Sequence, residues 1–162
     1  MNYHIDQQAA DSLPAEVRKG IREADPCDVG PRDWEATHFA LTAEDGSVAG
    51  GVYGATMWGW LMIDGLWVSE RLRGKGYGTK LLLSAEQAAM DRGCVGSWLG
   101  TFDFQAREFY ERHGYVVFSE LQGFPPGHTH YHLRKIFDRG EESAIPGPSW
   151  NESSRKEEGD EG

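Results

Sequence analysis

The chain has 162 residues, enough for one domain with a hydrophobic core and too few for two of ordinary size. Apolar residues make up 39% and charged residues 26%, which predicts a folded protein. The formal net charge of −10 argues against binding to nucleic acid, because proteins that track phosphates are usually basic. An acidic surface attracts cations, so the charge favours a small cationic partner.

The sequence lacks the signals of a secreted or membrane-spanning protein. Residues 1–10 have no apolar core of a signal peptide, and no apolar run approaches the roughly 18 residues of a membrane span. Cys27 and Cys94 lie far apart, which gives neither a disulfide framework nor a zinc-binding motif. We therefore expect a cytoplasmic protein that binds no metal.

The first third of the chain predicts a helix followed by a hairpin. Residues 12–24 carry apolar side chains at four-residue spacing, with Ser12 as the N-cap and Pro14 in the first turn. Residues 37–41 and 47–56 predict two strands, joined by a turn at Asp45 and Gly46.

The middle of the chain predicts a third strand and a long helix. Residues 58–68 are rich in aromatic and branched side chains, and Gly65 inside them suggests a bulge. Residues 77–92 have apolar side chains on one face, and Gly93 marks the end of the helix.

The last elements complete a mixed pattern. A strand over residues 95–102, a helix over 105–113 and strands over 115–121 and 129–136 follow in order. The whole pattern predicts an α/β sheet with helices packed on it. We expect one domain over residues 1–140 and a flexible tail over 141–162, where 7 acidic and 2 basic side chains lie.

A basic, glycine-rich loop between the third strand and the long helix is the most informative feature. Alternate glycines let backbone N–H groups converge, and a helix N-terminus adds partial positive charge, so the loop predicts a phosphate site. Its spacing fits neither the P-loop nor the dinucleotide-binding pattern. A solvated basic turn is the alternative. The loop holds Arg71, Arg73, Gly74, Lys75, Gly76 and Gly78.

The pattern Arg73-x-x-Gly76-x-Gly78 resembles the pyrophosphate loop of the GNAT superfamily of acetyl-CoA-dependent N-acetyltransferases. Residues 106–115 resemble a second hallmark, the helix A-x-x-x-Y-E-x-x-G-[FY] that flanks the thioester in that family. The resemblance covers about residues 37–137. It implies an α/β (α+β) single-domain GNAT fold, with a mixed, mostly antiparallel sheet, splayed central strands and flanking helices.

The resemblance implies acetyl-CoA as the acetyl donor. Backbone N–H groups near Trp67 and Val68 would meet the thioester carbonyl, as in an oxyanion hole. Gln105 stands where family members often carry an asparagine that binds pantetheine, and this departure weakens its assignment. The implied cofactor-binding residues are Leu66, Trp67, Val68, Arg73, Gly74, Lys75, Gly76, Tyr77, Gly78, Thr79 and Gln105.

Two residues are candidates for proton transfer. Tyr110 matches the family's tyrosine that protonates the leaving thiolate, and a phenol with a pKa of about 10 suits a thiol of about 8.5. A core aromatic is the alternative role. Asp64 is the candidate base, provided that Gly65 does not shift the register and turn it away from Leu66 and Val68. A carboxylate paired with a basic neighbour is its alternative.

Aromatic and histidine side chains are candidates for the acceptor site. Trp58 and Trp60, close to Tyr53 and Trp67, could bind an ammonium ion by cation–π contact, with core packing as the alternative. His128, His130 and His132 alternate on one strand and span about 13 Å, too far to share one metal ion. We expect His128, beside the Pro-Pro-Gly loop, to reach the acceptor.

The sequence therefore predicts an acetyl-CoA-dependent N-acetyltransferase that acts on a primary amine of a small, cationic acceptor. An aminoglycoside-type or kasugamycin-type antibiotic is the acceptor suggested by the general likeness to antibiotic-modifying members. A protein or peptide amine, a non-catalytic acyl-CoA sensor and a simple interaction domain are the alternatives. We expect no nucleic acid, membrane or metal as partner, and the choice between monomer and homodimer stays open.

Overall fold

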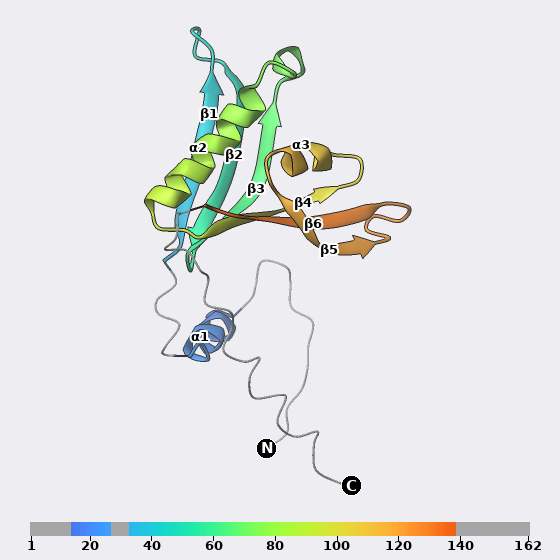
Figure 1. Ribbon diagram of the computed structural model, residues 1–162. Coiled ribbons are helices and arrows are strands. Elements are labelled where there is room, and N and C mark those ends of the chain that lie inside the picture. Colours follow the sequence, from blue (N-terminus) through green and yellow to red (C-terminus); the bar gives the residue numbers. More distant parts are fainter. Residues whose placement is uncertain (1–13, 27–32, 139–162) are drawn as a thin grey trace, which may run out of the picture. The chain divides into compact units, whose positions relative to one another are not determined.

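The computed structural model describes residues 14–26 and 33–138 (Figure 1). The chain divides into two compact units, Met1–Arg32 and Asp33–Gly162. The described part of the first unit is helix α1 (Ala15–Glu23), which follows Pro14 as its N-cap. A helix is thus confirmed within residues 12–24, but the predicted start is wrong: the helix begins at Ala15, so Pro14 is its N-cap in place of Ser12. Ser12 itself and the predicted tail over 141–162 lie outside the described residues.

The second unit is built on one six-stranded sheet in the order β1-β2-β3-β4-β6-β5. Every neighbouring pair is antiparallel except β3 and β4, which run parallel. The mixed, mostly antiparallel sheet is therefore confirmed. The strands are β1 (Glu35–Thr42), β2 (Val48–Met57), β3 (Trp60–Val68), β4 (Gly96–Phe102), β5 (Val116–Gln122) and β6 (Thr129–Ile136).

The two central strands separate halfway along their length. Residues 60–63 of β3 pair with residues 96–99 of β4, and the pairing ends at Ile63 and Leu99. Figure 1 shows β1–β3 and β4–β6 fanning apart beyond this point. The predicted splay is confirmed, and it lies where β3 runs into the glycine-rich loop.

The helices of this unit pack on one face of the sheet. Residues of α2 (Tyr77–Asp91) and α3 (Arg107–Arg112) share a hydrophobic core with Val52, Ile63 and Leu99 of the strands. Successive strand residues point to opposite faces, so Tyr53 and Gly100 point away from this core. We call the face on which they lie the open face, because α2 and α3 pack on the other one.

A buried polar network ties α2 to the sheet. The carboxylate of Glu86, 2% exposed, accepts hydrogen bonds from the Tyr115 hydroxyl (3.0 Å) and from Lys135 Nζ (2.6 Å). The Tyr115 oxygen also lies 2.9 Å from Ser97 Oγ. Burial raises the pKa of Tyr115, so its hydroxyl stays protonated and serves as the donor.

Two further findings concern the described residues alone. No helix in residues 14–26 or 33–138 has the length and apolar character needed to cross a bilayer. The same ranges contain no group of three or more histidine, cysteine, aspartate or glutamate side chains placed to hold a metal ion.

Candidate active site

A cavity of about 870 Å³ lies between β3 and β4 where their pairing ends. Its walls come from β3, the glycine-rich loop, the first turn of α2, the end of β4 and α3. Most of the candidate residues meet there, although they are separated by up to 46 positions in the chain. The candidates in its wall are Asp64, Leu66, Trp67, Val68, Arg73, Gly74, Gly76, Gly78, Thr79, Gln105 and Tyr110.

The glycine-rich loop turns sharply into α2. Gly74 and Gly76 have φ angles of +72° and +81°, a left-handed conformation that glycine adopts without steric cost. Gly76 is the N-cap of α2, and no side chain caps the helix, so its first N–H groups face no capping oxygen. Arg73 donates from Nε to the carbonyl of Val68 at 3.2 Å, which fixes a positive charge beside the loop.

Two of the predicted loop residues lie outside the cavity wall. Lys75 is exposed, and Tyr77 packs against the core with Lys80 Nζ at 5.4 Å from its ring centroid. The Lys75 side chain points to solvent and that of Tyr77 to the core, while the glycines beside them border the cavity.

Tyr110 closes the cavity from the side of α3. Its side chain is 7% exposed and packs edge-on against the rings of Phe109 and Tyr115. Burial raises the pKa of the Tyr110 hydroxyl, because the ionised phenolate loses solvation there. The group is therefore a protonated donor throughout the neutral range.

Asp64 lines the cavity, but it lies at a shift in strand register and so does not share a side of β3 with Leu66 and Val68. The pairing of β2 with β3 shifts between Tyr53 and Gly54, which leaves Asp64 as an extra residue on β3. The predicted bulge is real, and it turns Asp64 away from the side of Leu66 and Val68. The carboxylate is exposed, and no hydrogen bond or ion pair joins it to another described residue.

Gln105 holds the turn between β4 and α3. Its Oε1 accepts hydrogen bonds from the Phe102 N–H (3.0 Å) and the Thr101 hydroxyl (3.2 Å). Within residues 33–138 its Nε2 has no hydrogen-bond partner, and the side chain borders the cavity. The amide nitrogen is therefore left to donate to a ligand.

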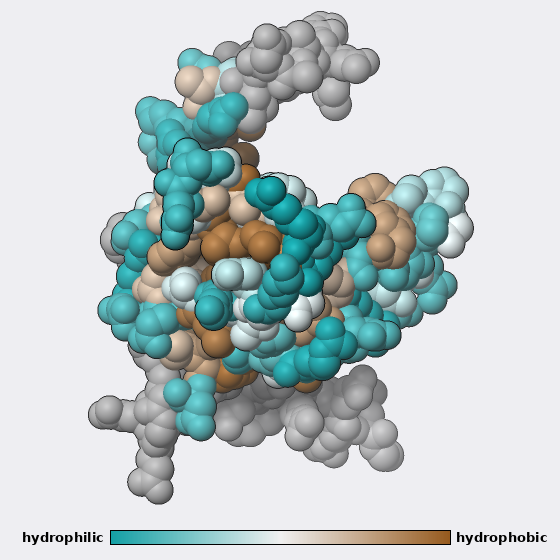
Figure 2. Space-filling model, turned by 90° about the horizontal axis from the view of Figure 1, so that it is seen from above, coloured by the Kyte–Doolittle hydropathy of each residue, from teal (hydrophilic) through white to brown (hydrophobic). Residues whose placement is uncertain are grey.

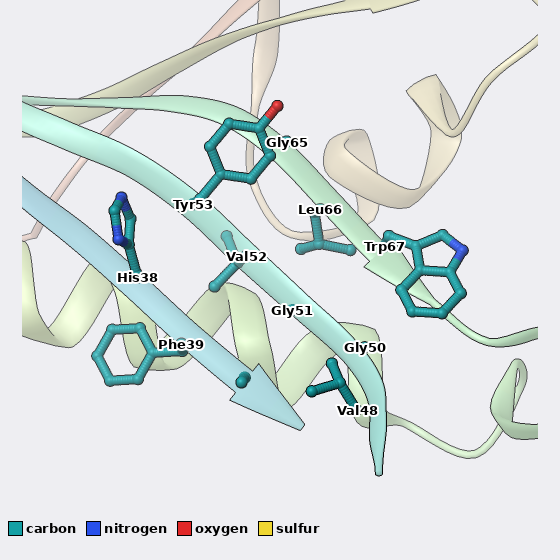
Figure 3. Close-up of a pocket in the computed structure, with 11 residues that line it drawn as sticks. His38, Phe39, Val48, Gly50, Gly51, Val52, Tyr53, Gly65, Leu66 and Trp67 are labelled. Carbon is teal, nitrogen blue, oxygen red and sulfur yellow. The ribbon is translucent and has the colours of Figure 1, made fainter. Parts of the chain in front are cut away.

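A second hollow, of about 630 Å³, lies over β1, β2 and β3 (Figure 3). Its floor contains Gly50 and Gly51, and the rings of Tyr53 and Trp67 stand on it. In Figure 3 the Tyr53 ring lies across Gly65, and α2 runs behind the strands. The hollow and the cavity share residues 65–67 of β3, so the two meet at the splay.

The end of the sheet near the splay carries exposed apolar surface. Figure 2 looks onto this end and shows apolar side chains at its centre, framed by hydrophilic ones. Val48 and Trp67 are 63% and 54% exposed. Sequence reasoning named Trp67 but missed Val48.

Three acceptor candidates lie away from the cavity. Trp58 occupies the turn before β3, and its backbone N–H donates to Asp33 Oδ1 at 2.6 Å. Trp60 begins β3 at the end opposite the loop, with its ring over Gly96. His128 Nδ1 lies 3.0 Å from Asp103 Oδ1, and its ring meets Phe104 of the cavity wall at 4.8 Å between centroids.

Sequence reasoning missed a contact between two helices at the cavity. Thr79 Oγ1 lies 3.0 Å from His113 Nε2, and His113 Nδ1 lies 2.7 Å from the Phe109 carbonyl. It also missed Gly100 and Phe104 in the wall. A glycine inside a strand signals close approach of another group, and Gly100 could have been found on that ground.

Comparison with known proteins gives concordant matches. The sequence pattern of the acetyltransferase (GNAT) family matches residues 8–115. A blasticidin-S acetyltransferase of Streptomyces morookaense is 38% identical over 132 residues, which cover 81% of this chain and 92% of that protein. An acetyltransferase of Agrobacterium fabrum is 34% identical, over 79% of this chain and 96% of its own.

Solved structures agree with the fold. An acetyltransferase from Bacillus cereus has a TM-score of 0.73 at 31% identity, covering 83% of this chain and 98% of that one. A Bacillus anthracis structure in complex with acetyl coenzyme A has a TM-score of 0.57 at 21% identity, over 67% of this chain and 65% of its own. The chain is therefore an acyltransferase that belongs to the GNAT family of acetyltransferases.

Proposed function

We propose that the protein transfers the acetyl group of acetyl-CoA to a primary amine of a small, cationic molecule. The observation that carries this proposal is the meeting of two depressions at β3. The cavity is bordered by α2 and α3, whereas the hollow lies on the open face, and both share residues 65–67. A donor in the cavity and an acceptor in the hollow would thus meet through the splay.

The cavity suits coenzyme A in size and in chemistry. Its volume of about 870 Å³ falls in the usual range of ligand pockets. The uncapped N-terminus of α2, the glycine backbone at Gly74 and Gly76 and the charge of Arg73 favour a pyrophosphate. Residues 64–68 pair with no residue of β4, so the backbone groups on that edge of β3 can bind the amides of the pantetheine arm. Lys75 and Tyr77 are not part of this proposed site, because they do not line the cavity.

Acetyl transfer asks three things of the protein. The thioester carbonyl needs a hydrogen-bond donor, for which we propose the N–H of Val68. The neighbouring Ser69 N–H bonds to the carbonyl of Ala49 on β2, and successive N–H groups of a strand point to opposite edges, so the Val68 N–H faces the splay. The leaving thiolate needs a proton, for which we propose the buried Tyr110 hydroxyl. The amine needs to be uncharged when it attacks. Asp64, an exposed carboxylate at the cavity, would attract the ammonium form to this place.

The acceptor class rests on charge, on aromatic surface and on one relative. The net charge of −10 and the rings of Tyr53 and Trp67 suit an ammonium ion. The similarity to a blasticidin-S acetyltransferase extends over 92% of that protein, which favours a small antibiotic amine over a peptide amine. An aminoglycoside is the second acceptor that we propose to test.

A thermal melt with acetyl-CoA, CoA and an adenine nucleotide tests the donor. Ligand at 100 times its dissociation constant stabilises by about 2.7 kcal/mol, which is roughly 5–11 °C for a chain of this size. CoA release with blasticidin S, an aminoglycoside and a lysine peptide then tests the acceptor. A shift with both CoA forms but no release with any amine would favour a sensor. No shift at all would overturn the donor site.

A further inference from the structure

The imidazole of His130 lies at the splay. A Cβ placed on Gly100 would lie 2.7 Å from both Cε1 and Nε2 of His130, so the ring fills the space that glycine leaves. Gly100 is the first residue of β4 after the last pair with β3, and it lines the cavity. The Nε2 edge of His130 is therefore beside the point where the cavity opens between the strands.

The ring lies on the open face, the same face of the sheet as the hollow proposed for the acceptor. Gly100 follows the core residue Leu99 and so points to the opposite face. On the other side of the splay, the ring of Tyr53 covers Gly65 on that same face. Rings from β2 and β6, the strands next to β3 and β4, thus flank the gap, and a molecule entering it from the open face would pass between them.

The His130 ring is held in place, but its nitrogens are unused. Its centroid lies 4.5 Å from the Phe102 ring, 4.7 Å from the His132 ring and 6.0 Å from the Phe124 ring. Neither nitrogen makes a hydrogen bond to another residue within 33–138. By contrast, His128 on the same strand is paired with Asp103 and His113 is bonded through both nitrogens.

The surroundings of His130 favour the neutral ring. Partial burial, together with the charge of His132, lowers the pKa of His130 below its ordinary value of 6.5. The groups facing it from β4, β5 and the turn between β5 and β6 are uncharged: Gly100, Phe102, Leu121 and Phe124. Further along β6, His128 and its partner Asp103 are the next titratable groups. At pH 7 the ring is free to accept a proton.

We infer that His130 accepts the proton that the acceptor's ammonium group loses before it attacks the thioester. The inference rests on the proposed function and names its base. The ammonium gives one proton to His130, which later releases it to water. The neutral nitrogen then forms the C–N bond as the C–S bond breaks. The second proton of that nitrogen replaces the one that Tyr110 gives to the thiolate.

The chemistry favours His130 over Asp64 for this step. A carboxylate is in general a weaker base toward an ammonium ion than an imidazole. The bulge also turns Asp64 away from the side of Leu66 and Val68. The carboxylate can still attract the cation, which leaves proton transfer to the imidazole.

The test is the pH dependence of kcat/KM for an acceptor amine in three variants. His130→Gln should lower kcat/KM at pH 7 about 100-fold or more and remove the fall in rate on the acid side. His132→Gln should keep that fall and move it to higher pH, because the variant lacks the charge that lowers the pKa of His130. Asp64→Asn should raise KM and leave the acid limb in place.

The thermal shift with acetyl-CoA serves as the folding and binding control and should be unchanged in His130→Gln. Unchanged kcat/KM and acid limb in His130→Gln would overturn the inference. Loss of the acid limb in Asp64→Asn, with the limb intact in His130→Gln, would overturn it in favour of Asp64. If the unsubstituted protein binds acetyl-CoA but acetylates no amine, the proposed function fails first, and the inference fails with it.

Discussion

The hydroxyl oxygen of Thr79 lies 3.0 Å from Nε2 of His113, which joins the first turn of α2 to the end of α3. The other ring nitrogen, Nδ1, faces the carbonyl of Phe109 at 2.7 Å and must carry the hydrogen, because a carbonyl only accepts. In the neutral ring Nε2 is then the acceptor for Thr79. This bond fixes the helix start that borders the proposed pyrophosphate site.

Removing this bond should weaken coenzyme A binding. His113→Phe and Thr79→Val each remove one partner, and a neutral hydrogen bond contributes about 1 kcal/mol, or about fivefold in Kd. Calorimetric titration with CoA measures the change. The double variant should lose little more than either single one, since both disrupt the same bond. Fully additive losses would show that the two residues act separately.

Gly76→Val should impair CoA binding beyond its effect on stability. The φ of +81° strains any branched residue, although open space surrounds the new side chain. Gly46→Val is the matched control, because Gly46 has the same φ, the same open surroundings and a place in the turn between β1 and β2. Both variants should lose about 1–2 kcal/mol of stability, and Gly76→Val alone should lose affinity. Equal affinities in the two variants would contradict the loop assignment.

Tyr110→Phe should lower kcat about 100-fold or more while the affinity for acetyl-CoA stays within twofold. The variant keeps the ring contacts with Phe109 and Tyr115 and removes the hydroxyl alone. Because burial raises the pKa of this hydroxyl, it stays protonated beyond its ordinary value of about 10. Steady-state rates of the unsubstituted protein should therefore show no loss from this group below pH 10. A fall at lower pH that vanishes in Tyr110→Phe would contradict the raised pKa.

Tyr115→Phe should lower the free energy of unfolding without changing the rate of acetyl transfer. The change leaves Glu86, 2% exposed, without one of its two donors, and such a loss costs about 1–3 kcal/mol. Urea unfolding measures it. Tyr53→Phe is the control for stability, since the Tyr53 side chain is 55% exposed and the loss of its hydroxyl should change unfolding by less than about 0.5 kcal/mol.

Local sequence patterns were enough to predict the helices and strands and to find the glycine-rich loop. The four-residue spacing of apolar side chains gives α2, and its start at Tyr77 follows from the glycines before it. The order of strands and helices, with the motif around Tyr110, indicates the family, and the expected splay comes from that resemblance. The motifs themselves lie within short stretches of sequence, and so they can be recognised without knowing what lies across the sheet.

The acceptor side could not be read in this way. Whether Asp64 faces Leu66 depends on the register between β2 and β3, which a single strand does not reveal. Trp58 and Trp60 are close in sequence to Trp67, but a strand of nine residues carries them to its far end. His130 gains its position from the missing Cβ of Gly100 on another strand. Each of these positions depends on how two strands pair, which the sequence of one strand does not reveal.

Four residue pairs between β3 and β4 make the strand pairing that joins the two three-stranded halves of the sheet. Every other backbone group along the facing edges of these strands is a latent strand partner. A ligand arm bonded to both edges would act as a removable seventh strand and would lengthen the seam that joins the halves. The two halves would then share more backbone hydrogen bonds while the donor is bound, and slower amide exchange along residues 64–68 would report the added bonds.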